Sequence, residues 1–297
     1  MKIQRPGNTE SHLLLHSYLR KNNSPEYSKY DEKLYINWLY TTSGFYDKSI
    51  DDPAKNYTTT IKSYNYNKWL DKYIEAINNS LHIGFYLDKG RDLTQTESQT
   101  FLKYIDLHFK AGSISVNHTP YYNNTHYHFN SYWCLEDLTK NKGILHDHYD
   151  MLEDKIVLVV SAFSELIEYQ YNNNINKIFP SFPKFKQLKT YTTPYTFLNN
   201  GPDDNFFDTL ETLICDISKI KFDIALLSCG TYATFICDHI DAKLNRDSMY
   251  MGSGCNSMFG INPHLDKEKY PFWITKIPKH LIYEHSKSIE NGVYWHK

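Results

Sequence analysis

The second half of the chain alternates short apolar runs with longer amphipathic runs, and this alternation constrains the fold more than any other feature. Residues 156–161 (IVLVVS) form a short β-branched run. The next residues, SELIEYQY, place Leu166, Ile167 and Tyr171 at helical spacing. A strand followed by a helix is the repeating unit of proteins built on a mostly parallel sheet. The pattern predicts an α/β protein.

The same alternation continues along the chain. Further strands are predicted at residues 186–191, 222–228 and 248–252, and helices at residues 203–220 and 229–244. In the first half, strands are predicted at residues 2–4 and 81–87, and helices at residues 10–21, 65–79 and 96–109. Residues 112–150 show no period and receive no assignment. We expect a Rossmann-like, doubly wound, mostly parallel sheet.

No linker interrupts the sequence, so we expect one domain over residues 1–297, with residues 263–297 as a Pro- and aromatic-bearing tail wrapping it. Hydrophobic residues make up 41% and charged residues 22% of the chain, which are values of a folded globule. The sequence does not indicate an oligomeric state.

The net charge of −2 gives no global field to hold a polyanion or an acidic membrane, which argues against nucleic acid as a partner. No segment has the roughly 18 to 20 apolar residues of a membrane span, and the N-terminus does not resemble a signal peptide.

The cysteines are five in number and form no CxxC or other metal-ligand spacing. They are Cys134, Cys215, Cys229, Cys237 and Cys255. This usage predicts reduced thiols in a cytosol-like compartment, the host cytoplasm if the protein is viral.

Loops at the carboxyl ends of parallel strands meet at one edge of the sheet, where helix N-termini present free N–H groups to anions. The sequence predicts three such loops, at residues 5–10, 161–165 and 228–232. Gly230 would allow a sharp turn that exposes the N–H groups of Thr231 and Tyr232 to a diphosphate. The alternative is that Gly230 serves only the turn.

A fourth loop, rich in glycine, follows the strand predicted at residues 248–252. Gly252 and Gly254 would make it flexible enough to close over a base or a ribose. The alternative is a helix-entry turn capped by Asn256 or Ser257.

The turn after the first strand holds Arg5, Asn8 and Glu10. The carboxylate of Glu10 is suited to hold a divalent cation or to take a proton from an acceptor hydroxyl, and Arg5 is suited to neutralise a leaving diphosphate. The alternative is structural: Asn8 or Thr9 caps the helix and Glu10 complements its dipole.

Histidines are concentrated between residues 118 and 148, and HxH occurs twice there. They are His118, His126, His128, His146 and His148. In a strand, HxH points both rings to one face, which suits zinc. No regularly spaced Cys or carboxylate accompanies them, so a loop without metal is favoured, in which one His acts as a base or binds a sugar. GxSxG, P-loop and HExxH motifs are absent from the sequence.

Taken together, residues 5–10, 157–171, 222–240 and 250–261 resemble a family of proteins from polysaccharide gene clusters and large DNA viruses that is similar to the D-type glycosyltransferase (GT-D) fold. That family shows an Arg-x-Gly-x-x-Glu start, a strand ending in Ser/His-x-Phe with a later Gln-Tyr, and a strand ending in Ser-x-Gly-x-Tyr before a Gly-rich, Phe-Gly loop. The resemblance covers the start and roughly residues 150–262, in the same order.

The resemblance implies a glycosyltransferase that moves a sugar from a nucleotide-sugar donor to a glycan acceptor, with Glu10 and Arg5 as catalytic residues. It implies that the donor is bound by Gly7, Asn8, Ser161, Phe163, Ser164, Gln170, Ser228, Gly230, Tyr232, Gly252, Gly254 and Asn256. It also implies Mg²⁺ or Mn²⁺ at Glu10 and Asn8, although Asn8 stands where the family has Asp, and an amide binds hard cations more weakly.

Two other functions remain open at this point. One is a non-catalytic carbohydrate-binding or assembly protein on the same scaffold, which the Tyr and Trp content would suit. The other is a Rossmann-type methyltransferase or nucleotide-processing enzyme, which the missing glycine-rich fingerprint after the first strand disfavours.

Overall fold

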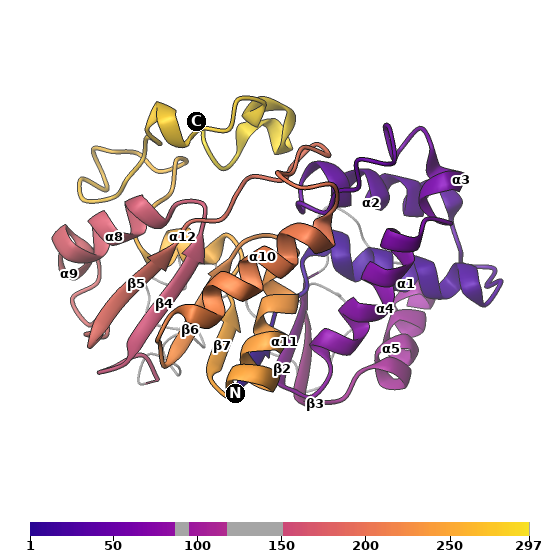
Figure 1. The fold of residues 1–297 in the computed structure, drawn as a ribbon, viewed down its shortest axis with the longest axis horizontal. Helices are drawn as coiled ribbons and strands as arrows, with labels where there is room; N and C mark the ends of the chain where they lie inside the picture. Colours follow the sequence, from indigo (N-terminus) through magenta and orange to yellow (C-terminus); the bar gives the residue numbers. More distant parts are fainter. Residues whose placement is uncertain (87–94, 118–150, 297) are drawn as a thin grey trace.

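A computed structural model describes residues 1–86, 95–117 and 151–296. These residues form one seven-stranded sheet in which every neighbouring pair of strands is parallel, in the order β3-β2-β1-β7-β6-β4-β5. The strands are β1 (Lys2–Gln4), β2 (Ser80–Tyr86), β3 (Ala111–Asn117), β4 (Ile156–Ser161), β5 (Gln187–Tyr191), β6 (Ile224–Ser228) and β7 (Asp247–Tyr250). The predicted α/β, Rossmann-like class is confirmed (Figure 1).

Helices connect the strands. They are α1 (Asn8–Lys21), α2 (Lys29–Thr41), α3 (Tyr57–Thr60), α4 (Tyr64–Ile77), α5 (Gln95–His108), α8 (Ser164–Asn173), α9 (Ile175–Ile178), α10 (Phe206–Lys219), α11 (Tyr232–Leu244) and α12 (Gly254–Met258). Most predicted elements are confirmed within a few residues. The elements that were missed are α2, β3 at the start of the region left unassigned, and the short helices α3 and α9. The five clustered histidines lie outside the described residues.

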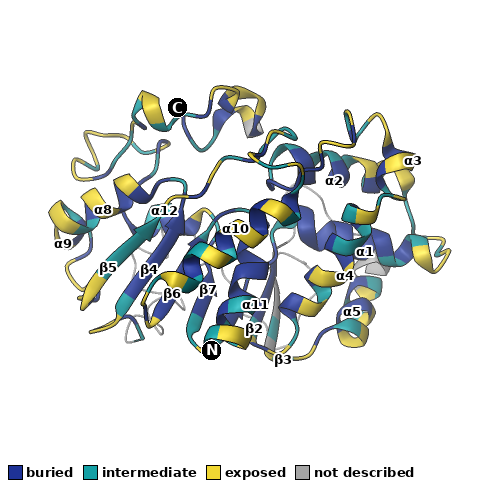
Figure 2. Ribbon diagram, in the orientation of Figure 1, coloured by how far each residue is buried: buried dark blue, intermediate teal, exposed yellow. Residues whose placement is uncertain are grey.

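The sheet separates two hydrophobic cores because successive side chains of a strand point to opposite faces. In β4, Leu158 and Val160 belong to one core, whereas Val157 and Val159 belong to the other. All four are fully buried, as expected for a strand covered on both faces. Figure 2 shows that the central strands are mostly buried, while the outer face of α10 is exposed.

Each core is covered by a different set of helices. Helices α4, α5, α10 and α11 contribute to the first core, together with α1. Helices α8 and α12 contribute to the second. The connections from β1 to β2, β2 to β3, β5 to β6 and β6 to β7 all run toward β3, and their helices lie on one face of the sheet. The connection from β4 to β5 runs the other way, and its helix α8 lies on the opposite face. Right-handed crossovers require this arrangement.

The carboxyl edge of the sheet, where the strands end, has two points at which neighbouring strands send the chain in opposite directions. After β1 the chain goes toward β2, whereas after β7 it goes toward α8 and the far side of the sheet. After β6 it goes to β7, whereas after β4 it goes to β5. We call these places the β1/β7 switch and the β4/β6 switch.

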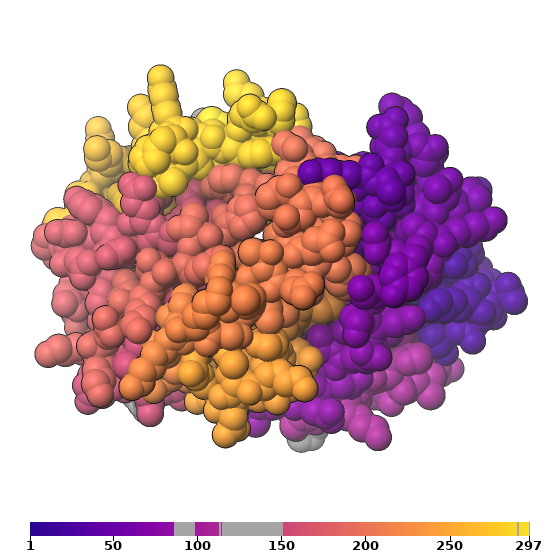
Figure 3. Space-filling view, viewed as in Figure 1, coloured from indigo at the N-terminus to yellow at the C-terminus, as the bar shows by residue number. Residues whose placement is uncertain are grey.

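The segment at residues 263–296 follows α12 and contains three short 3₁₀ turns. Its large side chains are inserted into the second core; they include Trp273, Ile277, Tyr283, Ile289 and Trp295. In Figures 1 and 3 this segment (yellow) lies along the side of the molecule toward which β4 and β5 point. Among the described residues, no helix combines the length and the apolar character needed to cross a membrane.

Candidate functional site

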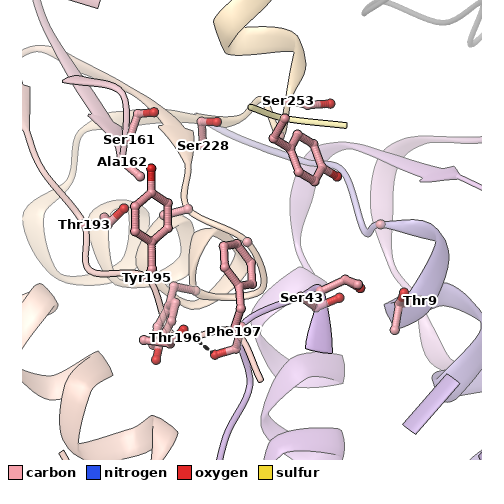
Figure 4. A pocket seen from close by; sticks show the side chains of 18 of the residues that line it. Thr9, Ser43, Ser161, Ala162, Thr193, Tyr195, Thr196, Phe197, Ser228 and Ser253 are labelled. Carbon is pink, nitrogen blue, oxygen red and sulfur yellow. Dashed lines mark hydrogen bonds between the residues drawn. The ribbon is translucent and has the colours of Figure 1, made fainter. Parts of the chain in front are cut away.

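A cavity of about 760 Å³ lies at the carboxyl edge and reaches both switches. Its walls come from the turns after β1, β4, β6 and β7, the segment after β5, the end of α2 and the C-terminal segment. Figure 4 shows Ser161, Ser228 and Ser253 in a row along the edge, with Thr9 and Ser43 across the opening. The volume is within the range of about 300 to 1,000 Å³ typical of ligand pockets.

Most of the site residues named from the sequence line this cavity. They are Arg5, Gly7, Asn8, Glu10, Ser161, Phe163, Ser228, Gly230, Tyr232, Gly252 and Asn256. The parallel sheet brings together turns that are far apart in the sequence, which was the physical basis of the expectation.

Three named residues do not line the cavity, and two of them have hydrogen-bond contacts within the protein instead. The amide of buried Gln170 donates to the carbonyl oxygens of Gly260 (2.8 Å) and Phe272 (3.1 Å), and so holds the chain after α12 against α8. The Ser164 hydroxyl is 2.5 Å from that of Thr192. Gly254 is buried at the start of α12.

Arg5 and Glu10 both come from the turn between β1 and α1. Glu10 is 2% exposed, and its carboxylate lies against Gly7. Arg5 lies against Gly252, where an added Cβ would be 2.6 Å from its Nη1. Burial raises the pKa of the nearby Tyr250 hydroxyl; the charge of Glu10 raises it further and that of Arg5 lowers it. Both charges are therefore at the β1/β7 switch.

The first turn of α1 lacks the side-chain cap that the structural alternative predicts at Asn8 or Thr9. Asn8 is the first helical residue rather than the cap, and Gly7 in the N-cap position makes no side-chain cap. Capping by Asn8 or Thr9 is therefore wrong. Glu10 does lie in the first turn, where a carboxylate complements the helix dipole, so its structural and functional roles are compatible.

The turn after β6 is shaped by contact with the end of α2. Gly230 has φ +59°, and an added Cβ would be 2.5 Å from the carbonyl oxygen of Ser43. The same oxygen accepts a hydrogen bond from the N–H of Thr231 at 2.9 Å. The expectation that this N–H is exposed to a diphosphate is therefore wrong. After β4, the N–H of Phe163 donates to Ser161 Oγ at 3.1 Å.

The turn after β7 contains Gly252 at φ +55°, followed by Ser253 as the N-cap residue of α12. Asn256 and Ser257 are inside that helix, so the alternative in which one of them caps it is wrong. Asn256 lines the cavity, and its buried Oδ1 has no hydrogen-bond partner among the described residues. A buried acceptor without a donor is costly unless a bound molecule supplies one.

Sequence reasoning missed a large part of the wall. The missed residues are Asn37, Trp38 and Thr41–Gly44 near the end of α2, Thr193–Phe197 after β5, and Ser288, Tyr294 and Trp295 in the C-terminal segment. Residues 193–197 follow a predicted strand, so the carboxyl-edge rule would have found them. The end of α2 had no such signal, since the helix itself was not predicted.

Four rings, which we call the aromatic wall, close the cavity on the β5 side: Phe163, Tyr195, Phe197 and Trp295. The centroid of Trp295 is 5.7 Å from that of Tyr195, 6.0 Å from Phe197 and 6.5 Å from Phe163. Tyr195 donates its hydroxyl to the Leu281 carbonyl at 2.9 Å and accepts from the Trp295 indole at 3.4 Å. Burial raises the pKa of the Tyr195 hydroxyl, which keeps it a donor.

Helix α2, which forms the opposite wall, is held by a buried carboxylate. Glu32 is 0% exposed and accepts from Arg20 Nε at 3.1 Å, Tyr27 at 2.9 Å and Tyr57 at 2.7 Å. These bonds join α2 to α1 and α3. Asn37 and Trp38 of α2 line the cavity, so this network positions one side of the site.

Of the described residues that line the cavity, Arg5 and Glu10 are the two with charged side chains. No group of three or more His, Cys, Asp or Glu side chains suited to a metal occurs within the described part of the chain. Glu10 and Asn8 alone supply one carboxylate and one amide. Divalent cations take about six or more oxygen ligands, so these residues fit a resident cation poorly.

The four described cysteines are free thiols, while Cys134 lies outside the described residues. No protein-family model, curated protein or solved structure matches this chain.

Proposed function

We propose that the protein transfers a sugar from a nucleotide-sugar donor to a glycan acceptor in this cavity. One observation supports the proposal above all: separate strand-to-helix turns, chosen from the sequence for their chemistry, meet around one cavity of about 760 Å³. Its lining combines hydroxyl and amide side chains with aromatic rings, and it carries one cation and one carboxylate, both from the same turn. That set suits a ligand with one compact anionic group and many hydroxyls.

We place the donor diphosphate beside Arg5. The amides of Phe163 and Thr231 are already donors within the protein, and we assign the anion to the guanidinium and the first turn of α1, which carry positive charge and backbone N–H groups. The nucleoside then lies toward Gly252 and Asn256. The Oδ1 of Asn256 can accept an N–H or O–H from it, which would satisfy a group that the described protein leaves unpaired.

The proposed chemistry needs one base and one stabilised leaving group. An acceptor hydroxyl oxygen bonds to the anomeric carbon of the donor sugar, and the bond between that carbon and the phosphate oxygen breaks. The electron pair leaves with the nucleoside diphosphate, whose charge Arg5 stabilises. The hydroxyl proton passes to the carboxylate of Glu10.

A divalent cation, if one takes part, would have Glu10 and Asn8 as its protein ligands and would help neutralise the diphosphate. Because the described residues supply only this pair, and substrate phosphates and water would have to complete the ligand set, no step above is assigned to a metal. Transfer measured with added Mg²⁺ or Mn²⁺ and with a chelator tests the point directly.

The experiment is a transfer assay with a panel of nucleotide sugars on the wild type and on Glu10→Gln. General-base catalysis contributes about 10²- to 10⁴-fold, so we expect kcat to fall by roughly that factor. Glu165→Gln is the matched control, since Glu165 is exposed and outside the cavity. A folded Glu10→Gln protein with full activity would remove Glu10 from this role.

A non-catalytic carbohydrate-binding protein is the second candidate, and the aromatic wall is the observation that favours it. The same assay separates the two functions. Glycan binding without transfer or donor hydrolysis, across the whole nucleotide-sugar panel, would favour the binding protein.

A further inference from the structure

The two switches divide the cavity into two parts of different chemistry. The β1/β7 switch carries Arg5 and Glu10. At the β4/β6 switch, Ser161 and Ser228 are direct neighbours across the paired strands, and Thr193 follows on the β5 side. A single cavity that covers two switches offers places for two ligands.

We propose that the part at the β4/β6 switch is the acceptor subsite and that it selects an uncharged carbohydrate. The inference rests on the proposed function, because it divides that same cavity between donor and acceptor. It adds the chemical class of the acceptor, and it assigns to the acceptor Ser161 and Ser228, which the resemblance had assigned to the donor.

Hydroxyl groups and rings face this part from two sides. Figure 4 shows Thr193 beside the ring of Tyr195, with Ser161 and Ser228 above them and Phe197 nearer the middle of the cavity. A pyranose has hydroxyls around its edge and apolar C–H groups on its faces. Serine and threonine hydroxyls match the edge, and aromatic rings match the faces.

Charge excludes other acceptors. The described residues on this side of the cavity contribute no Lys, Arg or His side chain. A carboxylate or phosphate moved there would lose hydration without gaining a side-chain cation, which disfavours it relative to a neutral sugar. A uronic acid or a lipid phosphate is therefore a poor acceptor in comparison with a neutral sugar.

The aromatic wall is built in advance of binding. Tyr195 is held by Leu281 and Trp295, and Tyr283 packs behind it with ring centroids 5.5 Å apart. Rings already fixed by the protein lose little conformational freedom when a ligand packs on them, which favours binding.

The test measures two ligands separately by calorimetry: a nucleoside diphosphate (UDP and GDP), and neutral disaccharides such as lactose, maltose and cellobiose at millimolar concentration. Two variants test the acceptor side and the donor side of the cavity separately. Thr193→Val with Ser228→Ala removes two hydroxyls from the acceptor side, and Arg5→Gln removes the cation from the donor side. Thermal denaturation establishes that both variants fold.

We expect a disaccharide to bind while the nucleoside diphosphate is bound. The double variant should weaken disaccharide binding about tenfold, the effect of two neutral hydrogen bonds, and leave nucleoside diphosphate affinity unchanged. Arg5→Gln should do the reverse. A disaccharide in which one sugar is a uronic acid should bind at least tenfold more weakly than its neutral analogue.

Four results would overturn the inference: no binding by any neutral disaccharide, competition between disaccharide and nucleoside diphosphate, displacement of the disaccharide by uridine or guanosine, or tighter binding of the uronic acid analogue. Failure of the proposed transferase is a separate outcome. In that case no nucleoside diphosphate binds, while disaccharide binding and its loss in the double variant remain.

Discussion

Replacing Gly230 by alanine tests whether the turn after β6 is held by its contact with Ser43. Two costs add up. An alanine at φ +59° is in the left-handed region, which costs about 1 to 2 kcal/mol. Its Cβ would also be 2.5 Å from the Ser43 carbonyl oxygen, closer than real Cβ contacts, so that oxygen must move. The hydrogen bond from Thr231 to it then weakens by about 0.5 to 1.5 kcal/mol.

The sum predicts a free energy of unfolding lower by about 1.5 to 3.5 kcal/mol, with a Tm lower by roughly 2 to 6 °C for a chain of this length. The assay is urea denaturation followed by circular dichroism, in which the midpoint falls and the slope m stays constant. Binding of a nucleoside diphosphate should weaken as well, since the displaced segment lines the cavity.

Asn245→Ala is the matched control. Asn245 ends the same helix, α11, with φ +51°, and it already carries a Cβ. This variant tests the left-handed conformation without a new clash, and we expect a cost of about 1 kcal/mol or less. Equal destabilisation by the two substitutions would refute the contribution assigned to Ser43.

Three further predictions follow from other contacts. Gly252→Ala should lower nucleoside diphosphate affinity at least tenfold by calorimetry and leave disaccharide binding intact, because the new Cβ displaces the Arg5 guanidinium; unchanged affinity would contradict the place given to Arg5. Glu32→Ala should lower the free energy of unfolding in urea by about 3 kcal/mol, since it leaves Arg20 without its carboxylate, whereas the exposed Glu75→Ala should change it by less than about 0.5 kcal/mol. Iodoacetamide at about pH 8 should modify exposed Cys215 and spare Cys237 and Cys255, because burial raises the pKa of both thiols to about 12; equal labelling by mass spectrometry in the folded protein would count against that burial.

The strands β4 and β6 could be predicted because a strand buried on both faces is a continuous apolar run, and such runs are conspicuous in the sequence. Strand β3 was missed because its residues, AGSISVN, are small and polar, as an edge strand tolerates. Helix α2 was missed because its buried face includes two tyrosines and Glu32 beside two aliphatic residues, so its apolar period is weak.

The site was predicted in part for a related reason. The meeting of the turns after β1, β4, β6 and β7 follows from parallel topology alone, so the sequence was sufficient to predict it. Which individual side chains and amides face the cavity could not be predicted. Whether the amide of Thr231 is exposed depends on Ser43, and whether Gln170 faces the cavity depends on the chain near Gly260. Both contacts join segments that local patterns do not relate.

The cavity draws one wall from Arg5 and another from Trp295, residues that are almost as distant along the polypeptide as two described positions can be. A molecule that binds both walls therefore stabilises contacts between the two ends of the polypeptide. Ligand should raise the resistance of the whole protein to heat and proteases through mass action, rather than order one loop locally. The chain must also form these long-range contacts before a ligand can bind in the cavity. Because such contacts form slowly, ligand binding becomes possible only late in folding.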